Sequence, residues 1–208
     1  MTLSNKITFL RALLSLIVYV LLLMPGFWAK FAGLMLFAIA AATDYLDGKI
    51  ARETNTVTSF GKIADPFVDK VLIIAAFMAF LSNPVLDIPV WTVFVIVIRE
   101  LTITTLRVIA GLDGLVLGAD RWGKLKTVVQ MVSAIVILAM LCLYELSLFA
   151  DFKNSATTIF ITLYKLPYIL AITTAVVTFF SGFSYIANNY KSLQKSWTAE
   201  KKQKKKKA

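Results

Sequence analysis

The sequence alternates between six long apolar segments and shorter polar ones. A helix needs about 20 mostly apolar residues to cross the hydrocarbon core of a bilayer, and each segment is close to that length. We therefore expect an all-α, polytopic membrane protein with six transmembrane helices. The expected spans cover roughly residues 7–24, 27–47, 60–81, 88–109, 124–148 and 159–187. Pro167 lies inside the last span and predicts a kink there.

Basic residues are unevenly distributed between these spans. Lys and Arg collect on the cytoplasmic side of membrane proteins, and one side of the six-span arrangement carries a clear excess of them. These residues are Lys6, Arg11, Lys49, Arg52, Lys62, Arg107, Arg121, Lys124, Lys126 and the lysines near the C-terminus. We therefore expect cytoplasmic termini, one transmembrane domain over residues 1–190, and a polar, lysine-rich tail over residues 191–208 that is frayed or disordered at its end.

The composition supports a membrane protein and excludes several kinds of site. Hydrophobic residues make up 59% of the 208 residues, and much of the net charge of +10 lies in the tail. The tail either binds anionic lipid or only fixes the topology. No folded basic face accompanies it, which argues against a nucleic-acid partner. The sequence has no His, and we expect its one cysteine, Cys142, to be a packing residue.

Four aspartates lie at the facing ends of the second and third apolar segments. A carboxylate at the centre of a bilayer costs about 2.5–3.5 kcal/mol, so acidic residues in such segments indicate functional sites. On helices, Asp44 and Asp47 share one face, and so do Asp65 and Asp69. The short polar loop between the segments predicts an antiparallel helix pair, which would bring the four carboxylates together.

The residues around these aspartates favour phosphate chemistry. Gly48, Ala51 and Gly61 are small enough to leave space for a ligand, and Arg52 offers a fork of donors to a phosphate. Carboxylate oxygens select hard divalent ions such as Mg²⁺, Mn²⁺ or Ca²⁺. Such ions stabilise the charge that develops in phosphoryl transfer, and a carboxylate less committed to metal can accept the proton of an attacking hydroxyl.

This set of residues resembles the signature of the CDP-alcohol phosphatidyltransferase family. The pattern is Asp44-x-x-Asp47-Gly48-x-x-Ala51-Arg52, eight residues, and then Gly61-x-x-x-Asp65-x-x-x-Asp69, with every fixed position met. The resemblance implies a six-helix fold, a homodimer, and attack by an alcohol hydroxyl on the lipid-linked phosphate of a CDP-linked lipid, with release of CMP. It also implies that Asp44, Asp47, Asp65 and Asp69 ligate Mg²⁺ or Mn²⁺, that Asp69 is the general base, and that Gly48, Ala51, Arg52 and Gly61 line the CDP site.

Further stretches are similar to the bacterial phosphatidylglycerophosphate synthase subfamily. The opening Asn5-x-x-Thr8-x-x-Arg11 matches that subfamily, although Ser4 stands where a proline is often found. Asn5 and Thr8 share a helical face and either contact the nucleotide or belong to the start of the first helix. The stretch at 123–130, Gly-Lys-Leu-Lys-Thr-Val-Val-Gln, matches the subfamily pattern Gly-Lys-x-Lys-Thr-x-x-Gln.

The fourth and fifth segments carry cations that bear on the acceptor. Arg107, Lys124 and Lys126 lie at the cytoplasmic ends of these segments, where they suit an anionic, phosphorylated acceptor such as glycerol 3-phosphate. The alternative is that these side chains only fix the topology and extend to the interface. Arg99 and Glu100 lie deeper, and we interpret them as an internal ion pair that holds the fourth helix.

The sequence therefore predicts a metal-dependent transferase in the plasma membrane of a bacterium. It would form phosphatidylglycerol phosphate and CMP from CDP-diacylglycerol and glycerol 3-phosphate, at a cytoplasmic active site. One alternative is the same chemistry with another acceptor, such as inositol phosphate, serine or phosphatidylglycerol. A cation transporter is a second alternative, which the position of the carboxylates at one end of the bilayer disfavours. A purely structural scaffold would leave the clustered carboxylates unexplained.

Overall fold

The computed structural model describes the backbone of residues 3–50, 59–112, 121–148 and 153–207. Within these ranges, side chains are described for residues 9–42, 66–112, 121–148, 158–190 and 194. The elements in chain order are α1 (Leu3–Leu23), α2 (Phe27–Ile50), α3 (Ser59–Leu81), the short 3₁₀ helix η1 (Pro84–Leu86), α4 (Val90–Leu112), α5 (Arg121–Ser147), α6 (Lys153–Leu163) and α7 (Leu166–Lys207). All regular structure in the described ranges is helical, which confirms the expected all-α class.

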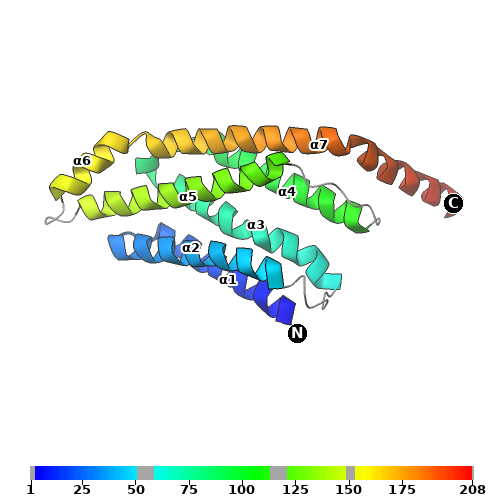
Figure 1. The fold of residues 1–208 in the computed structure, drawn as a ribbon, viewed down its shortest axis with the longest axis horizontal. Helices are drawn as coiled ribbons and strands as arrows, with labels where there is room; N and C mark the ends of the chain where they lie inside the picture. Colours follow the sequence, from blue (N-terminus) through cyan, green and yellow to red (C-terminus); the bar gives the residue numbers. More distant parts are fainter. Residues whose placement is uncertain (1–2, 51–58, 113–120, 149–152, 208) are drawn as a thin grey trace.

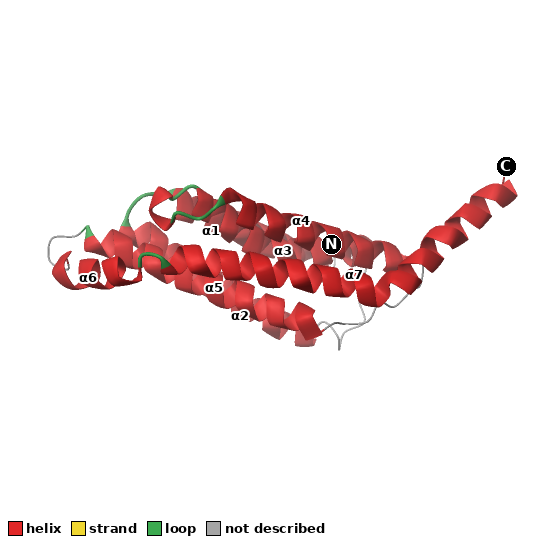
Figure 2. Cartoon of the chain, turned by 90° about the horizontal axis from the view of Figure 1, so that it is seen from above, coloured by secondary structure: helices red, strands yellow, loops and turns green. Residues whose placement is uncertain are grey.

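The helices form an elongated bundle of roughly aligned rods (Figures 1 and 2). α1 packs against α2 and α3, while α7 packs against α4 and α5. Contacts of α2 with α5 and of α3 with α4 join these two groups. α3 meets α1 much more extensively than it meets α2. The first helix therefore contacts both helices that carry the acidic motif.

The turn between α1 and α2 depends on a glycine and on a hydrogen bond from Lys30 to α1. Gly26 has a φ of 99°, a conformation that a residue without a side chain adopts at little steric cost. The ammonium of Lys30, which is 2% exposed, donates a hydrogen bond to the carbonyl of Leu22 in the last turn of α1. A cation at this position satisfies one of the carbonyls that the end of a helix leaves without a partner.

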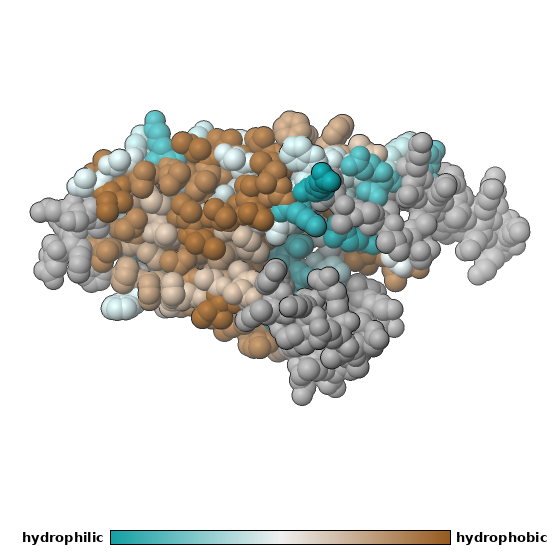
Figure 3. Space-filling model, viewed as in Figure 1, coloured by the Kyte–Doolittle hydropathy of each residue, from teal (hydrophilic) through white to brown (hydrophobic). Residues whose placement is uncertain are grey.

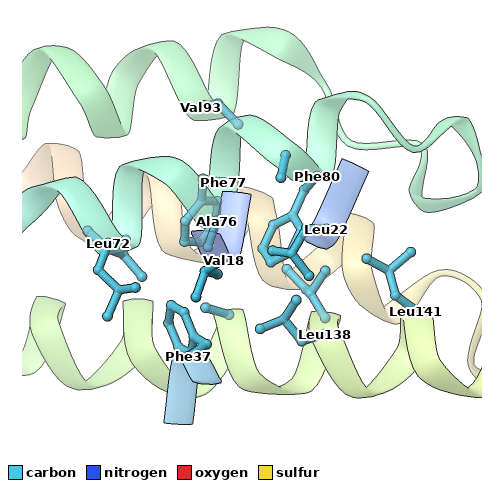
Figure 4. Close-up of a cluster of buried hydrophobic side chains, with 14 of the residues drawn as sticks. Val18, Leu22, Phe37, Leu72, Ala76, Phe77, Phe80, Val93, Leu138 and Leu141 are labelled. Atoms are coloured by element: carbon cyan, nitrogen blue, oxygen red, sulfur yellow. The ribbon is translucent and has the colours of Figure 1, made fainter. Parts of the chain in front are cut away.

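An apolar cluster lies where α1, α2, α3, α4 and α5 meet (Figure 4). Phe37 of α2 and Phe77 and Phe80 of α3 are fully buried in it, next to Val18 of α1 and Leu138 of α5. Because lipid is as apolar as these side chains, close packing rather than release of water holds such helices together. The cluster fixes α3, and with it the C-terminal side of the acidic motif, against α1.

The sixth expected span differs from the structure. Residues 159–187 do not form one kinked helix, because a turn at Tyr164 and Lys165 separates α6 from α7. Pro167 is the second residue of α7, where the missing N–H removes no helical hydrogen bond. Its ring would clash with the preceding turn of a continuous helix, so α6 ends before it. Figure 2 shows α6 beside the turn at one end of the bundle.

The tail also differs from the expectation of a frayed or disordered end. Its backbone continues α7 as a helix to Lys207 and extends past the other helices (Figures 1 and 2). Lys, Glu, Gln and Ala are good helix formers, and a tail joined to an existing helix needs no new nucleation step. The first residues of α1 and the last of α7 lie toward the same end of the bundle (Figure 1).

The outer surface of the bundle is strongly apolar. Figure 3 shows hydrophobic residues over most of one face, with hydrophilic residues gathered toward the end where the tail extends. Two helical stretches of the described residues, Arg121–Ser147 and Thr158–Tyr190, are long and apolar enough to cross a membrane, and Phe9–Leu23 and Phe27–Ala42 are shorter apolar stretches. These features are compatible with a membrane protein, whereas the six-span topology stays a prediction.

Candidate active site

The acidic motif lies across the end of α2 and the beginning of α3. The backbone of Asp44, Asp47 and Gly48 belongs to the last two turns of α2, and that of Gly61, Asp65 and Asp69 to the first three turns of α3. Both groups are therefore helical, as their spacing predicts. Ala51 and Arg52 lie outside the described residues. Of Asp44, Asp47, Gly48, Gly61 and Asp65, and of Asn5 and Thr8 in α1, the structure describes only the backbone. The convergence of the four carboxylates stays a prediction.

Asp69 is the motif carboxylate whose surroundings the structure describes. Nη1 of Arg11, in α1, donates to Oδ1 of Asp69, in α3, and forms an ion pair across the two helices. The Asp69 side chain is 34% exposed and that of Arg11 is 15% exposed, so the carboxylate is held from one side and reachable from another. Arg11 was part of the opening pattern but not of the predicted site. Its sequence signal is an arginine in the otherwise apolar first segment.

A buried carboxylate, Glu100 of α4, forms a second polar centre. It is 1% exposed, and its Oε1 accepts a hydrogen bond from the ammonium of Lys126 in α5. Nε2 of Gln130, one turn further along α5, donates to the same oxygen at 3.1 Å, and Nη1 of Arg99 lies 3.4 Å from it. The expected internal ion pair of Arg99 and Glu100 is thus present, and Lys126 is a closer partner of the carboxylate. We call Arg99, Glu100, Lys126 and Gln130 the Glu100 cluster.

Helix α7 completes the surroundings of the Glu100 cluster with hydroxyl groups. Nη2 of Arg99 donates to Oγ of Ser181 at 3.0 Å, and Nε2 of Gln130 lies 3.3 Å from Oγ1 of Thr178. Gly182 allows Arg99 to lie against α7, because a Cβ at this glycine would stand 2.9 Å from Cγ of Arg99. Polar groups in a low-dielectric interior are costly when unpaired, so this network fixes α4, α5 and α7 relative to one another.

The three predicted acceptor-binding cations occupy different surroundings. Lys126 is 3% exposed and bound to Glu100, whereas Lys124, in the first turn of α5, is exposed. Arg107 is also exposed, and its guanidinium carbon lies 5.4 Å from the centre of the Tyr185 ring in α7. Sequence reasoning did not identify Tyr185, because an aromatic residue in an apolar segment carries no signal of its own.

The Glu100 cluster is electrically unbalanced and lies near the acidic motif. It contains two cations, Arg99 and Lys126, and one carboxylate. Arg107 is within electrostatic range of Arg99, and Lys70, the neighbour of Asp69 in α3, is within range of Lys126. An excess of positive charge in apolar surroundings favours an anionic ligand. The helix that carries Asp69 therefore adjoins a region suited to a phosphate group.

The donor types of the acidic motif fit a hard divalent ion. The described backbone places Asp44 and Asp47 one helical turn apart, and Asp65 and Asp69 likewise, so each helix offers two carboxylates on one side. Asp69 is partly exposed and therefore able to meet a ligand. Oxygen donors of this kind suit Mg²⁺ or Mn²⁺. The described side chains alone contain no group of three metal-ligating residues.

Comparisons with known proteins agree with the motif. The family model described as CDP-alcohol phosphatidyltransferase matches residues 1–180. The chain is 34% identical over 207 residues to the CDP-diacylglycerol–glycerol-3-phosphate 3-phosphatidyltransferase of Bacillus subtilis (strain 168), with 93% of this chain and 98% of that protein covered. Proteins of the same name from Treponema pallidum (strain Nichols) and Mycoplasma pneumoniae (strain ATCC 29342 / M129 / Subtype 1) are 32% and 36% identical, over 79% and 72% of this chain and 72% and 63% of their own length.

Proposed function

The chain belongs to the CDP-alcohol phosphatidyltransferase family, and from this premise we propose that it makes phosphatidylglycerol phosphate and CMP from CDP-diacylglycerol and glycerol 3-phosphate. The observation that carries the proposal is the similarity, over 93% of this chain and 98% of the relative, to a protein that bears the name of this activity. The complete acidic motif supports the chemistry, and the excess of cations around Glu100 supports an anionic acceptor. The protein is thus an enzyme of phospholipid biosynthesis.

The acidic motif is the proposed metal site. Asp44, Asp47, Asp65 and Asp69 would hold Mg²⁺ or Mn²⁺, with two carboxylates from each helix. A divalent ion held there supplies charge neutralisation for the pyrophosphate of the lipid nucleotide. Gly48, Ala51, Arg52 and Gly61 would line the CDP site, together with Asn5 and Thr8 of α1. The contact of α1 with both motif helices supports a role for α1 in this site.

Asp69 is the proposed general base. Its carboxylate would accept the proton of the 1-hydroxyl of glycerol 3-phosphate as that oxygen bonds to the lipid-linked phosphorus. The bond from this phosphorus to the bridging pyrophosphate oxygen breaks, and CMP leaves with that oxygen. The ion pair with Arg11 fixes the orientation of Asp69, and its partial exposure leaves room for the attacking hydroxyl.

Arg107, Lys124 and Lys126 are the proposed ligands of the acceptor phosphate. Arg107 and Lys124 are exposed and can reach a ligand from solution. Lys126 would act from the interior, because its ammonium is bound to Glu100. Its contribution would come from its positive charge rather than from movement of the side chain toward the ligand. Glycerol 3-phosphate carries the dianionic group that such a set attracts, in contrast to serine.

We further propose a multi-pass protein of the bacterial plasma membrane, with both termini and the active site cytoplasmic, that acts as a homodimer. The apolar outer surface and the two long apolar helical stretches support the membrane location. The position of both chain ends toward one end of the bundle supports a common side for the termini. Proteolysis of inverted and right-side-out vesicles would test this, and protection of both termini in inverted vesicles would contradict it.

The decisive test is a panel of acceptors given to the purified protein with CDP-diacylglycerol. We expect CMP release with glycerol 3-phosphate and little with inositol phosphate, serine or phosphatidylglycerol. We expect a chelator to remove the activity and Mg²⁺ or Mn²⁺ to restore it. Release of CMP that requires inositol phosphate would contradict the proposed acceptor, and full activity in the chelator would contradict the metal site.

A further inference from the structure

Helix α7 contacts both arginines of α4, but in different ways. The guanidinium of Arg99 lies inside the bundle, where it donates a hydrogen bond to Ser181 and lies against Glu100. Arg107, about two turns further along α4, lies over the ring of Tyr185 instead, at 5.4 Å from the ring centre. Among the described side chains, no hydrogen bond or ion pair engages Arg107. Arg107 therefore has a fixed neighbour, while its N–H donors bind no side chain among the described residues.

Tyr185 is a rigid support for this contact. It is 2% exposed and is the largest of the fully buried side chains that the structure describes, so its ring has little freedom to move. A cation over the face of a ring is attracted through its charge, and the N–H donors at the edge of a guanidinium stay available to another partner. An exposed arginine without such a support would lose more conformational entropy on binding a ligand.

We propose that Tyr185 is a positioning residue of the acceptor site, whose ring holds the Arg107 guanidinium where it meets the phosphate of glycerol 3-phosphate. This inference rests on the proposed function, in which Arg107 binds that phosphate. The ring acts through Arg107 and does not itself touch the substrate. Through this contact, α7 contributes to the selection of the acceptor.

The hydroxyl of Tyr185 can be removed without the ring, so the role of the ring can be tested by itself. It is buried and has no hydrogen-bond partner among the described residues. Its removal in Tyr185→Phe therefore breaks no bond of the described structure and keeps the aromatic face. Tyr185→Leu removes the face as well. Tyr164 offers a control outside the proposed site, because its ring lies under Lys165, at 5.6 Å, in the turn between α6 and α7.

The test measures initial rates of CMP release by the full-length protein in lipid nanodiscs, with each substrate varied in turn. We expect Tyr185→Leu to raise the KM for glycerol 3-phosphate about tenfold, without a change in the KM for CDP-diacylglycerol, and Tyr164→Leu to change neither. Tyr185→Phe should keep the acceptor KM within about twofold of the unmodified protein. A variant that misfolds lowers the active fraction and hence kcat, but does not raise one KM alone.

A double-substitution cycle shows whether the ring acts through Arg107. We expect Arg107→Ala to raise the acceptor KM, and Tyr185→Leu to add nothing in the Arg107→Ala background. The inference would be overturned if Tyr185→Leu raised the acceptor KM in that background as much as it does alone. It would also be overturned if Tyr185→Phe raised the acceptor KM as much as Tyr185→Leu. An unchanged acceptor KM in Arg107→Ala would instead overturn the assignment of Arg107 in the proposed function.

Discussion

Lys126 of α5 and Glu100 of α4 form an ion pair in the interior of the bundle, where they are 3% and 1% exposed. Their positions are 26 residues apart in the chain, and Gln130 and Arg99 bind the same carboxylate oxygen. A lysine that the sequence suggests as a surface cation is thus part of the network between helices. Lys126 therefore has a structural role beside its proposed role in binding the acceptor phosphate.

Breaking this pair from one side should destabilise the protein strongly. Glu100→Gln leaves the Lys126 ammonium buried without its carboxylate, and we expect a loss of about 3–5 kcal/mol in unfolding free energy. The double variant Glu100→Leu with Lys126→Met removes both charges of the pair and should recover part of that stability, because Arg99 and Gln130 still lose their carboxylate partner. Unfolding in detergent, followed by circular dichroism, measures both. If the double variant were as unstable as Glu100→Gln, the unpaired ammonium of Lys126 would not be the cause of the lost stability.

The same double variant tests whether Lys126 contributes to acceptor binding. If its charge helps to hold the acceptor phosphate, the folded double variant should show a raised KM for glycerol 3-phosphate and an unchanged KM for CDP-diacylglycerol. An unchanged acceptor KM would assign Lys126 to the structure alone.

Asp69→Asn should nearly abolish turnover while preserving the fold. The amide cannot accept the proton of the attacking hydroxyl, and loss of a general base typically lowers a rate by about 10²–10⁴-fold. Binding of CDP-diacylglycerol, measured with a radiolabelled lipid, should fall much less than turnover. Asp87→Asn, at an exposed residue after η1, is the control and should behave as the unmodified protein. Near-normal turnover of Asp69→Asn would remove Asp69 as the base.

Arg11→Ala should lower kcat more than it lowers stability. The substitution removes the side chain that orients the Asp69 carboxylate, and we expect a fall in kcat of about 10-fold or more, in keeping with the sensitivity of catalysis to small displacements. Arg11→Lys keeps the charge and should retain a larger part of the activity. Equal activity of Arg11→Ala and the unmodified protein would mean that the ion pair has no part in turnover.

Gly182→Ala tests the contact of α7 with Arg99. Its Cβ would stand 2.9 Å from Cγ of Arg99, so Arg99 must shift and its bond to Ser181 weakens. We expect a loss of about 1–3 kcal/mol in unfolding free energy, as for other overpacked sites. Gly111→Ala in α4 meets nothing within 4 Å and should be neutral or stabilising. Equal effects of the two substitutions would contradict the steric explanation.

Much of the fold follows from local sequence features. Runs of apolar residues predict the first five helices within a few residues of those observed, whereas the sixth predicted span corresponds to two helices, α6 and α7, with the turn between them just before Pro167. The motif from Asp44 to Asp69 identifies the family and the helices that carry its chemistry, because its spacing is a property of the chain itself. The helical tail, which composition suggested would be frayed, follows α7 because an existing helix lowers the cost of extension.

The sequence by itself determined the helices, the excess of positive charge and the reaction class, since each depends on residues close together in the chain. Only the tertiary structure decided which polar groups meet. Arg11 and Asp69 are 58 residues apart, and Arg99 and Ser181 are 82 apart. Such contacts depend on how each helix is rotated about its axis when it packs, and on which charges are thereby removed from water. For this reason Lys126 lies inside and bound to Glu100, while Arg107 lies exposed over the ring of Tyr185.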